Sequence, residues 1–393
     1  MNTFNRRLFN LFRVRYLYRV EHFDHIVIGT GTMGAATCYH LAKQGKHVLG
    51  IDRFSPPHEN GSHGGHTRII RKAYFEHPDY IPLLERAYVN WKDLERETGR
   101  QLYFETGLLY GGLKENQILK NVKAAAAEYG IPLERLRHNP AGVFRLPSDY
   151  ELLFEPEAGF LLSDVAIGAF LEQAERKGAR LLNDTEVLSW RQQGDRIEVV
   201  TNEGIFTADR LVLTAGVWTD RLLEGVGSKL QVTRQVLAWF DTGGRDIYRM
   251  GHLPCWLMAD EQSTGAFYGF PEDPEHPTGI KVALHHPDAV TDPDAVDRTV
   301  TDSDLRTLRK FVARHLPGIP GTLREVKTCL YENSPDGDFV IDRLKGMEDR
   351  VCYAWGFSGH GFKFAAVIGE LLAELSIHGR TQLPIGFLSS NRF

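Results

Sequence analysis

HFDHIVIGTGTMGAATCYHLAKQGKHVLGIDRF, residues 22–54, is the stretch that decides the fold. The apolar, β-branched run at 25–28 predicts a strand, and 35–43 is rich in good helix formers with apolar residues on one side. A second apolar run at 47–51 predicts another strand. A strand, a glycine-rich turn, a helix and a second strand in this order are typical of a parallel α/β sheet.

Three glycines in that turn have the spacing G-x-G-x-x-G. Gly29 permits the tight turn, Gly31 lets the backbone approach a pyrophosphate, and Gly34 lets the helix pack closely on the strand. Asp52, 18 residues after Gly34, ends the second strand, where a carboxylate would accept hydrogen bonds from ribose hydroxyls. Because the free N–H groups at a helix N-terminus favour negative charge, the unit predicts a dinucleotide site. The alternative is a glycine-rich loop without a ligand.

The motif alone does not distinguish NAD from FAD. Its position at the start of the predicted ordered chain favours FAD, and so does the next segment, which is not an ordinary βαβ continuation. That segment, SPPHENGSHGGHTRIIRKAY at 55–74, ends in Arg68 and Arg71. Glycine-rich backbone beside arginines can hold an anion or lie along a flat ring. The alternative is a surface loop with solvated charges.

Bulk properties narrow the class of protein. A chain of 393 residues favours two domains, and a net charge of −5 argues against a nucleic-acid binder. No apolar run approaches the roughly 18 residues of a membrane span. The four cysteines form no C-x-x-C pair, so they suggest neither a metal site nor a disulfide framework. We therefore expect a cytoplasmic protein without a metal.

The first twenty residues differ in composition from the rest. Residues 1–20 contain five arginines and no acidic residue. We expect a disordered N-terminal extension; the alternatives are a basic amphipathic helix at a membrane surface and a transit peptide.

Later segments indicate that the nucleotide domain is interrupted by a second domain. RLVLTAGVWTDRLL at 210–223 predicts a buried strand, a glycine turn and a helix, and 163–190 predicts a helix followed by a strand. VLAWFDT, GAFYGFPED and GIKVALHH alternate as antiparallel strands do, and 302–318 predicts a helix that ends at Pro317. We expect an α/β (α+β) protein with a Rossmann-type FAD-binding domain (21–75, 156–224 and 326–393) and a second domain on a mostly antiparallel sheet (76–155 and 225–325).

Two further features could carry chemistry. In VKTCLYENSPDGDFVID, 326–342, Cys329 stands two residues before Tyr331, and it could be a buried small hydrophobe, a nucleophile or a covalent anchor. In WGFSGHGFKF, 355–364, a glycine-rich loop precedes Lys363 and an apolar helix, which suits backbone contact with an anionic ring oxygen.

The motifs GTGTMG, GSHGGHTRIIR, GFP…GIK-x-x-x-H, CLY…DFVID and GFSGHGFKF, in this order, resemble monomeric sarcosine oxidase and N-methyltryptophan oxidase. These belong to the flavoproteins with the D-amino-acid oxidase-like fold, and the resemblance extends from about residue 22 over nearly the whole chain. It implies FAD-dependent oxidation of a secondary amine, such as an N-methyl amino acid, with O2 as acceptor and with formaldehyde, the amino acid and H2O2 as products. It also implies a monomer that acts on a small molecule, with neither nucleic acid nor stable membrane association.

The resemblance also implies roles for single residues. Cys329 matches the cysteine that anchors the flavin through a thioether, and Arg71 and Lys363 match the pair that holds the substrate carboxylate. Catalytic or cavity-lining roles fall to Lys281 (reaction with oxygen), His285, Tyr268, Tyr331 and Arg68. Expected FAD contacts are Gly29, Gly31, Met33, Gly34, Asp52, Arg53, Ser62, His63, Thr67, Arg68, Val187, Gly216, Cys329, Gly359, Gly361, Phe362 and Lys363.

The chain departs from the family pattern at four positions. Gly64 replaces a histidine and His66 an aspartate beside the flavin, so we expect altered flavin redox tuning. Lys72 and Phe75 replace the first histidine and the glycine of HAYGE, and Phe75 is expected to reshape the substrate entrance. Two alternatives remain open at this point: a dehydrogenase of the same fold with another electron acceptor, and a flavin-binding subunit without catalysis.

Overall fold

The computed structural model describes residues 20–139, 142–223, 229–260, 265–273, 279–285 and 289–393. The predicted N-terminal extension lies outside these ranges apart from Val20. Within the described residues, no helix has both the length and the apolar character needed to cross a bilayer.

The first sheet is built around the predicted strand–helix–strand unit. Its central strands β12, β1, β2 and β9 run parallel, and β19 pairs in parallel with the far end of β12. An antiparallel hairpin and β18 extend the edges. The eight strands are β1 (Glu21–Ile28), β2 (Val48–Ile51), β9 (Arg180–Leu182), β10 (Val187–Gln193), β11 (Arg196–Thr201), β12 (Ile205–Leu213), β18 (Val340–Arg343) and β19 (Val351–Trp355).

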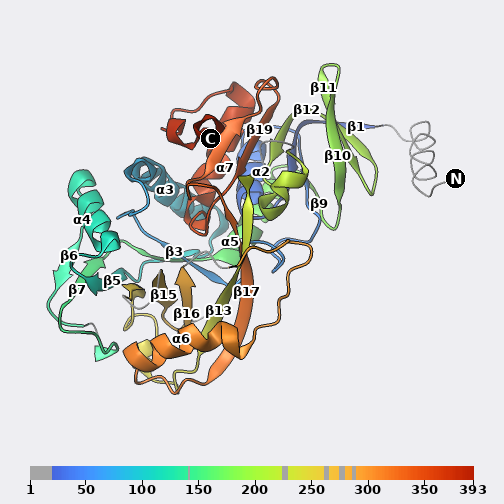
Figure 1. The fold of residues 1–393 in the computed structure, drawn as a ribbon. Helices are drawn as coiled ribbons and strands as arrows, with labels where there is room; N and C mark the ends of the chain where they lie inside the picture. The colour runs from blue at the N-terminus through green and yellow to red at the C-terminus, as the bar shows by residue number, and fades with distance from the viewer. Residues whose placement is uncertain (1–19, 140–141, 224–228, 261–264, 274–278, 286–288) are drawn as a thin grey trace.

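Helices cover one face of this sheet. α2 (Thr32–Lys43) packs between α7 (Ala365–His378) and α5 (Ser163–Arg176), and α3 (Ile81–Thr98) packs on α7. α2 and α7 are apolar on nearly every side because both lie inside this layer. The sheet and its helices form the upper part of the molecule in Figure 1.

The second sheet is antiparallel except for the pairing of β14 with β5. α6 (Asp302–His315) packs on one face through Phe311, which stacks on Trp256 and Phe267. The strands, in spatial order, are β17 (Leu323–Asn333), β13 (Gln231–Phe240), β16 (Ile280–His285), β15 (Ala266–Phe270), β14 (Cys255–Ala259), β5 (Leu108–Leu113), β7 (Tyr150–Glu155) and β6 (Glu134–Leu136).

The remaining elements are short or peripheral. A small sheet joins β3 (Thr67–Ile70), β8 (Gly159–Leu162) and β4 (Tyr103–Phe104), and α4 (Gln117–Tyr129) packs against β5. The 3-10 turns are η1 (Pro78–Tyr80), η3 (Gly216–Arg221), η5 (Asp246–Tyr248), η6 (Phe362–Phe364), η7 (Gly386–Leu388) and η8 (Ser390–Arg392).

The predicted fold class is confirmed: a parallel-centred sheet with helices accompanies a mostly antiparallel second sheet. One local prediction was wrong in type, because the helix expected at the end of 210–223 is the 3-10 turn η3. The division into domains stays a prediction. One boundary is affected by β17, which pairs with β13 in the second sheet, so that residues 326–333 share that sheet rather than the first.

The turn between β1 and α2 has the tight geometry that its glycines predict. Gly29 has φ +87°, and its N–H donates to the carbonyl of Ile51 at 2.8 Å. A Cβ added to Gly34 would lie 1.8 Å from the carbonyl oxygen of Gly29. The helix can therefore approach the strand only because residue 34 has no side chain.

We expect Gly34→Ala to lower the free energy of unfolding by about 1–3 kcal/mol, because the new methyl group must displace backbone. Thermal unfolding of the purified variant measures this loss. Gly168→Ala is the matched control, since Gly168 lies inside α5 and a Cβ there meets no atom within 4 Å. That control should gain up to about 1 kcal/mol from helix propensity; equal behaviour of the two variants would contradict the packing argument.

Candidate active site

A large cavity lies where the carboxyl ends of β1, β2 and β12 meet β17 and the loop after β19. It encloses about 1820 Å³, including solvent at its mouth. Most of the predicted site residues line it: Gly29, Gly31, Met33, Asp52, Arg53, Ser62, His63, Arg68, Arg71, Val187, Gly216, Tyr268, His285, Cys329, Tyr331, Gly359, Gly361, Phe362 and Lys363. Gly34, Thr67 and Lys281 lie behind its wall.

One end of the cavity is the dinucleotide turn. A Cβ added to Gly31 would meet only the His63 ring, at 3.8 Å, so the backbone there is open to the cavity. Asp52 accepts hydrogen bonds from the N–H groups of Thr30 at 2.7 Å and Phe54 at 2.9 Å. These bonds fix the carboxylate at the end of β2, in the position that a ribose-binding carboxylate requires.

The loop before β3 is held together by Arg68. Its guanidinium donates to the carbonyls of Ser62 at 2.9 Å, Gly64 at 2.6 Å and Thr67 at 2.8 Å. These bonds fold the loop around one cation, so the arginine orders the backbone that lines the cavity. Arg68 also faces the cavity itself, where its remaining charge can act on a bound group.

The two cations predicted to bind a carboxylate are buried in one region, although 292 residues separate them. Arg71 is 3% exposed, and both oxygens of Glu76 accept from its Nη2 at 2.7 Å. Tyr74 and Phe75 place their rings 4.3 and 4.0 Å from its guanidinium carbon. Burial is the largest influence on Glu76 and opposes its ionisation, but Arg71, His360 and Lys363 together outweigh it and lower the pKa of Glu76 to about 2.

Lys363 therefore supplies the positive charge that Glu76 does not neutralise. It is 5% exposed, and its Nζ donates to the carbonyl of His360 at 2.6 Å. Burial and the nearby Arg71 lower the pKa of Lys363 to about 7. His360 is buried too, which lowers its pKa to about 3, and its Nδ1 lies 2.5 Å from the hydroxyl of Tyr74. The ammonium group is thus ready to bind an anion that enters the cavity.

Aromatic side chains form the facing wall. His285 Nδ1 lies 3.4 Å from the hydroxyl of Tyr331, and Tyr331 and Tyr268 share a side-chain hydrogen bond. Phe75 also lines the cavity, next to Arg71, and its effect on the substrate entrance stays a prediction. This wall gives the cavity an apolar region beside its anion-binding region.

Lys281 and His285 both lie on β16, as predicted. Lys281 is 2% exposed, and its Nζ donates to the carbonyls of Gly65 at 2.7 Å and Thr67 at 2.9 Å. Burial, followed by the charge of Arg68, lowers its pKa well below the usual range. The ammonium group thus supports the loop of Arg68 and does not itself line the cavity.

Cys329 lies on β17, 1% exposed, in a cluster with Leu237, Trp239 and Tyr331. Burial raises the pKa of its thiol, while the positive charges of Arg68, Lys281 and Arg298 oppose that rise. The thiol thus combines an apolar site with nearby cations that favour its thiolate.

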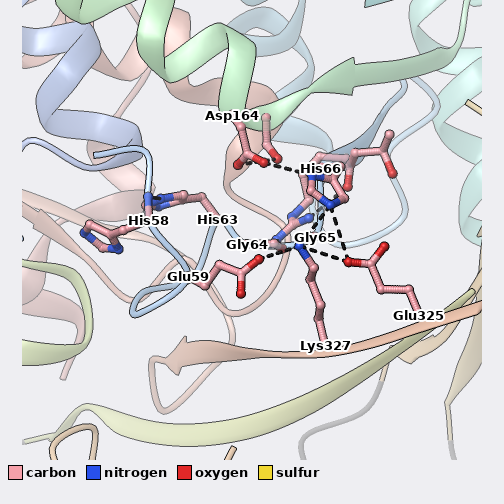
Figure 2. Close-up of polar contacts among 12 residues, drawn as sticks. His58, Glu59, His63, Gly64, Gly65, His66, Asp164, Glu325 and Lys327 are labelled. Atoms are coloured by element: carbon pink, nitrogen blue, oxygen red, sulfur yellow. Dashed lines mark hydrogen bonds and ion pairs between the residues drawn. The ribbon is translucent and has the colours of Figure 1, made fainter. Parts of the chain in front are cut away.

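The substituted loop position His66 is tied to a charged cluster outside the cavity wall (Figure 2). With φ +65°, it places Nδ1 3.0 Å from Asp164 and Nε2 2.9 Å from the Nζ of Lys327. Lys327 is in turn paired with Glu59 and Glu325. The cluster joins the loop to α5 and β17, and the predicted effect on the flavin stays a prediction.

Three functional side chains were not assigned a role from the sequence. Glu76 neutralises Arg71, His360 orders Tyr74 and Lys363, and Glu332 places a buried carboxyl group in the cavity wall. Glu76 and His360 lie inside recognised motifs. Their closeness in sequence to Arg71 and Lys363 was the signal that could have indicated their roles. Glu332 follows Tyr331 in the quoted stretch 326–342, but only the fold shows that its side chain is buried.

Solved structures with this architecture include NikD in its open form, described as an unusual amino acid oxidase essential for nikkomycin biosynthesis. It matches with a TM-score of 0.82 and 25% identity over 94% of this chain and 97% of that chain. L-proline dehydrogenase from P. horikoshii matches equally well in fold, with a TM-score of 0.82 over 95% of this chain and 98% of that chain at 24% identity.

Sequence relatives are closer. Monomeric sarcosine oxidase of Bacillus sp. (strain NS-129) is 39% identical over 94% of this chain and 97% of its own length. N-methyl-L-tryptophan oxidase of Yersinia pestis (strain Pestoides F) is 34% identical over 94% of this chain and 99% of its own length. Residues 24–375 match the family described as "DAO: FAD dependent oxidoreductase". The chain therefore belongs to the DAO family of FAD-dependent oxidoreductases.

Proposed function

We propose that the protein oxidises the secondary amine of an N-methyl amino acid, transfers the electrons to O2, and releases formaldehyde, the amino acid and H2O2. The observation that carries the proposal is the pair of buried cations, Arg71 and Lys363, in one cavity with Tyr268, Tyr331 and His285. The relatives named sarcosine oxidase and N-methyl-L-tryptophan oxidase support this substrate class. The reaction balances when one water hydrolyses the imine product.

The cavity fits FAD. The open backbone at Gly31 and the fixed carboxylate of Asp52 suit the adenosine and pyrophosphate at one end. Cys329 and the loop of Arg68 line the same cavity and suit the flavin ring. FAD, when bound, accepts a hydride equivalent from the carbon next to the substrate nitrogen.

The charges of Arg71, Glu76 and Lys363 orient the substrate through its carboxylate. Glu76 neutralises Arg71 and holds its guanidinium in place, so Arg71 offers its remaining N–H groups without adding net charge. Lys363 adds the net charge that a substrate carboxylate needs. The amine end of the substrate then faces the aromatic wall, where His285 and Tyr331 can hold it neutral by hydrogen bonding.

Lys281 promotes the reaction with O2 although its side chain does not line the cavity. Its ammonium group lies within the loop that Arg68 also orders. The two cations therefore create a positive electrostatic potential at that loop. Positive potential stabilises superoxide as it forms in the first electron transfer. We further propose a monomer in the cytoplasm: the Bacillus relative is named monomeric, and all four cysteines are free and buried, as a reducing compartment permits.

The first test is substrate turnover by the purified yellow protein. N-methyl amino acids are expected to bleach the flavin without oxygen and to yield H2O2 and formaldehyde in air. Lys363→Met should lower kcat/KM about 10- to 150-fold, the worth of a hydrogen bond to a charged group.

Lys72→Met is the matched control for that variant. Lys72 lies next to Arg71 in sequence but pairs with Glu157 at 2.6 Å, away from the cavity, and should leave kcat/KM unchanged. If N-methyl amino acids neither bleach the flavin nor yield H2O2, the proposal is wrong. Bleaching with slow reoxidation in air but rapid dye reduction would replace the oxidase by a dehydrogenase.

Carboxylate binding is expected to weaken as pH rises through about 7, because Lys363 then loses its proton. Propanoate, which carries no titrating amine, should bind about tenfold more weakly for each pH unit above that value until Arg71 alone remains. Perturbation of the flavin spectrum measures this affinity. Propanamide is the neutral control and should show no such slope, and Lys363→Met should remove it for propanoate.

Acid precipitation tests the covalent anchor. Flavin absorbance is expected in the pellet of the wild-type protein and in the supernatant of Cys329→Ser, which has no thiol at that position. Cys255→Ser is the control, because Cys255 is equally buried in the second sheet but lies outside the cavity wall. Wild-type flavin in the supernatant would show that the cysteine is not the anchor.

A further inference from the structure

Glu332 is a buried carboxyl group that the substrate-binding arrangement does not use. It lies near the end of β17, is 5% exposed and lines the cavity. The backbone N–H groups of Gly356 and Phe357 hydrogen-bond to it. Its Oε2 has no hydrogen-bond partner among the described residues. A buried oxygen in this state costs free energy unless a ligand completes its bonding.

No charge compensates this group. The elements packed against it present Val232 from β13, Gly216 from η3, and Gly356 and Phe357 after β19, none of which is titratable. Burial raises the pKa of Glu332 to about 8, more than the two backbone N–H groups lower it. At neutral pH the side chain is therefore a carboxylic acid, which can donate as well as accept a hydrogen bond.

Glu332 lies close both to the segment beside the dinucleotide turn and to Cys329. A Cβ added to Gly216 would lie 3.9 Å from its Oε2, and the segment just before Gly216 touches Gly29 of the dinucleotide turn. In the other direction, Cys329 lies three residues earlier on the same strand. A dinucleotide bound at the turn with its ring at Cys329 would bring its middle part, the ribityl chain and the adjoining phosphate, near Glu332. All of these groups carry oxygen acceptors.

We propose that Glu332 is a cofactor-binding residue that keeps its proton and donates a hydrogen bond to an oxygen of the central ribityl-diphosphate part of FAD. Protonation is required because an ionised carboxylate next to a diphosphate would repel it. The inference rests on the family's FAD cofactor and not on the identity of the amine substrate.

The test uses the purified flavin-containing protein without substrate, so its outcome is separate from that of the turnover experiments. Visible circular dichroism of the flavin is recorded from pH 6.5 to about 10. Glu332 should contribute a spectral step with a midpoint at or above pH 8, because the donor is lost as Glu332 ionises. This step is distinct from any change that Lys363 causes near pH 7, and a Lys363→Met background removes that earlier change. Glu332→Gln keeps a neutral donor of the same shape and should abolish the step while retaining the flavin.

Glu332→Ala removes the donor and should weaken flavin retention. It is compared in a Cys329→Ser background, so that a covalent bond cannot hide the loss. The dissociation constant of the flavin, measured by ultrafiltration, should be about two- to tenfold higher than in Cys329→Ser alone. This is the change expected from the loss of one hydrogen bond. If that background or the alanine variant does not yield folded protein, the spectral step and Glu332→Gln decide the question.

Glu198→Gln is the matched control. Glu198 is 4% exposed on β11 of the first sheet, pairs with Arg191 at 2.6 Å and does not line the cavity. It should keep the pH step and the flavin content of the wild type. Persistence of the step in Glu332→Gln, absence of any step in the wild type, or unchanged dissociation in Glu332→Ala would each overturn the proposal.

Discussion

The contact between the Gly29 carbonyl and the backbone of Gly34 is the constraint on which the rest of the structure depends. It brings the N-terminus of α2 directly below the end of β1. α7 packs on α2 so closely that a Cβ at Gly369 would lie 2.5 Å from Ala36, and Lys363 lies just before α7 begins. Lys363 therefore takes its place from the same close approach that forms the dinucleotide turn.

Burial of charge decides how the cavity works. Arg71 and Glu76 cancel each other at the cost of two desolvated groups, and the resulting rigid pair presents N–H groups in a fixed direction. Lys363 has no such carboxylate partner and stays near its point of titration, whereas Glu332 avoids a buried charge by holding its proton. Each of these buried groups thus lowers its desolvation cost differently. Arg71 becomes a rigid hydrogen-bond donor, Lys363 a cation that can lose its proton, and Glu332 a neutral donor, all within one cavity.

Local patterns predicted the parts of the fold whose causes are local. β1, α2 and β2 follow from glycine spacing and periodicity, and the strands of the second sheet follow from alternation. The 3-10 form of η3 was missed because a short segment after a strand is shaped by the cavity and not by its own propensity. Arg71 and Lys363 were paired through the family resemblance, since nothing in their own segments shows that they meet. Glu332 escaped notice because an acidic residue beside a turn signals solvent, and only the packing of β17 shows it buried.

β17 carries the thiol of Cys329, the hydroxyl group of Tyr331 and the carboxyl group of Glu332 within four residues of one strand. A strand alternates its faces with a strict period of two, so inserting or deleting one residue here would turn every one of these groups to the wrong side. Loops around the cavity can lengthen or shorten as new substrates are selected, but this strand cannot change its length. The length and register of β17 are therefore a constraint on the whole cavity wall.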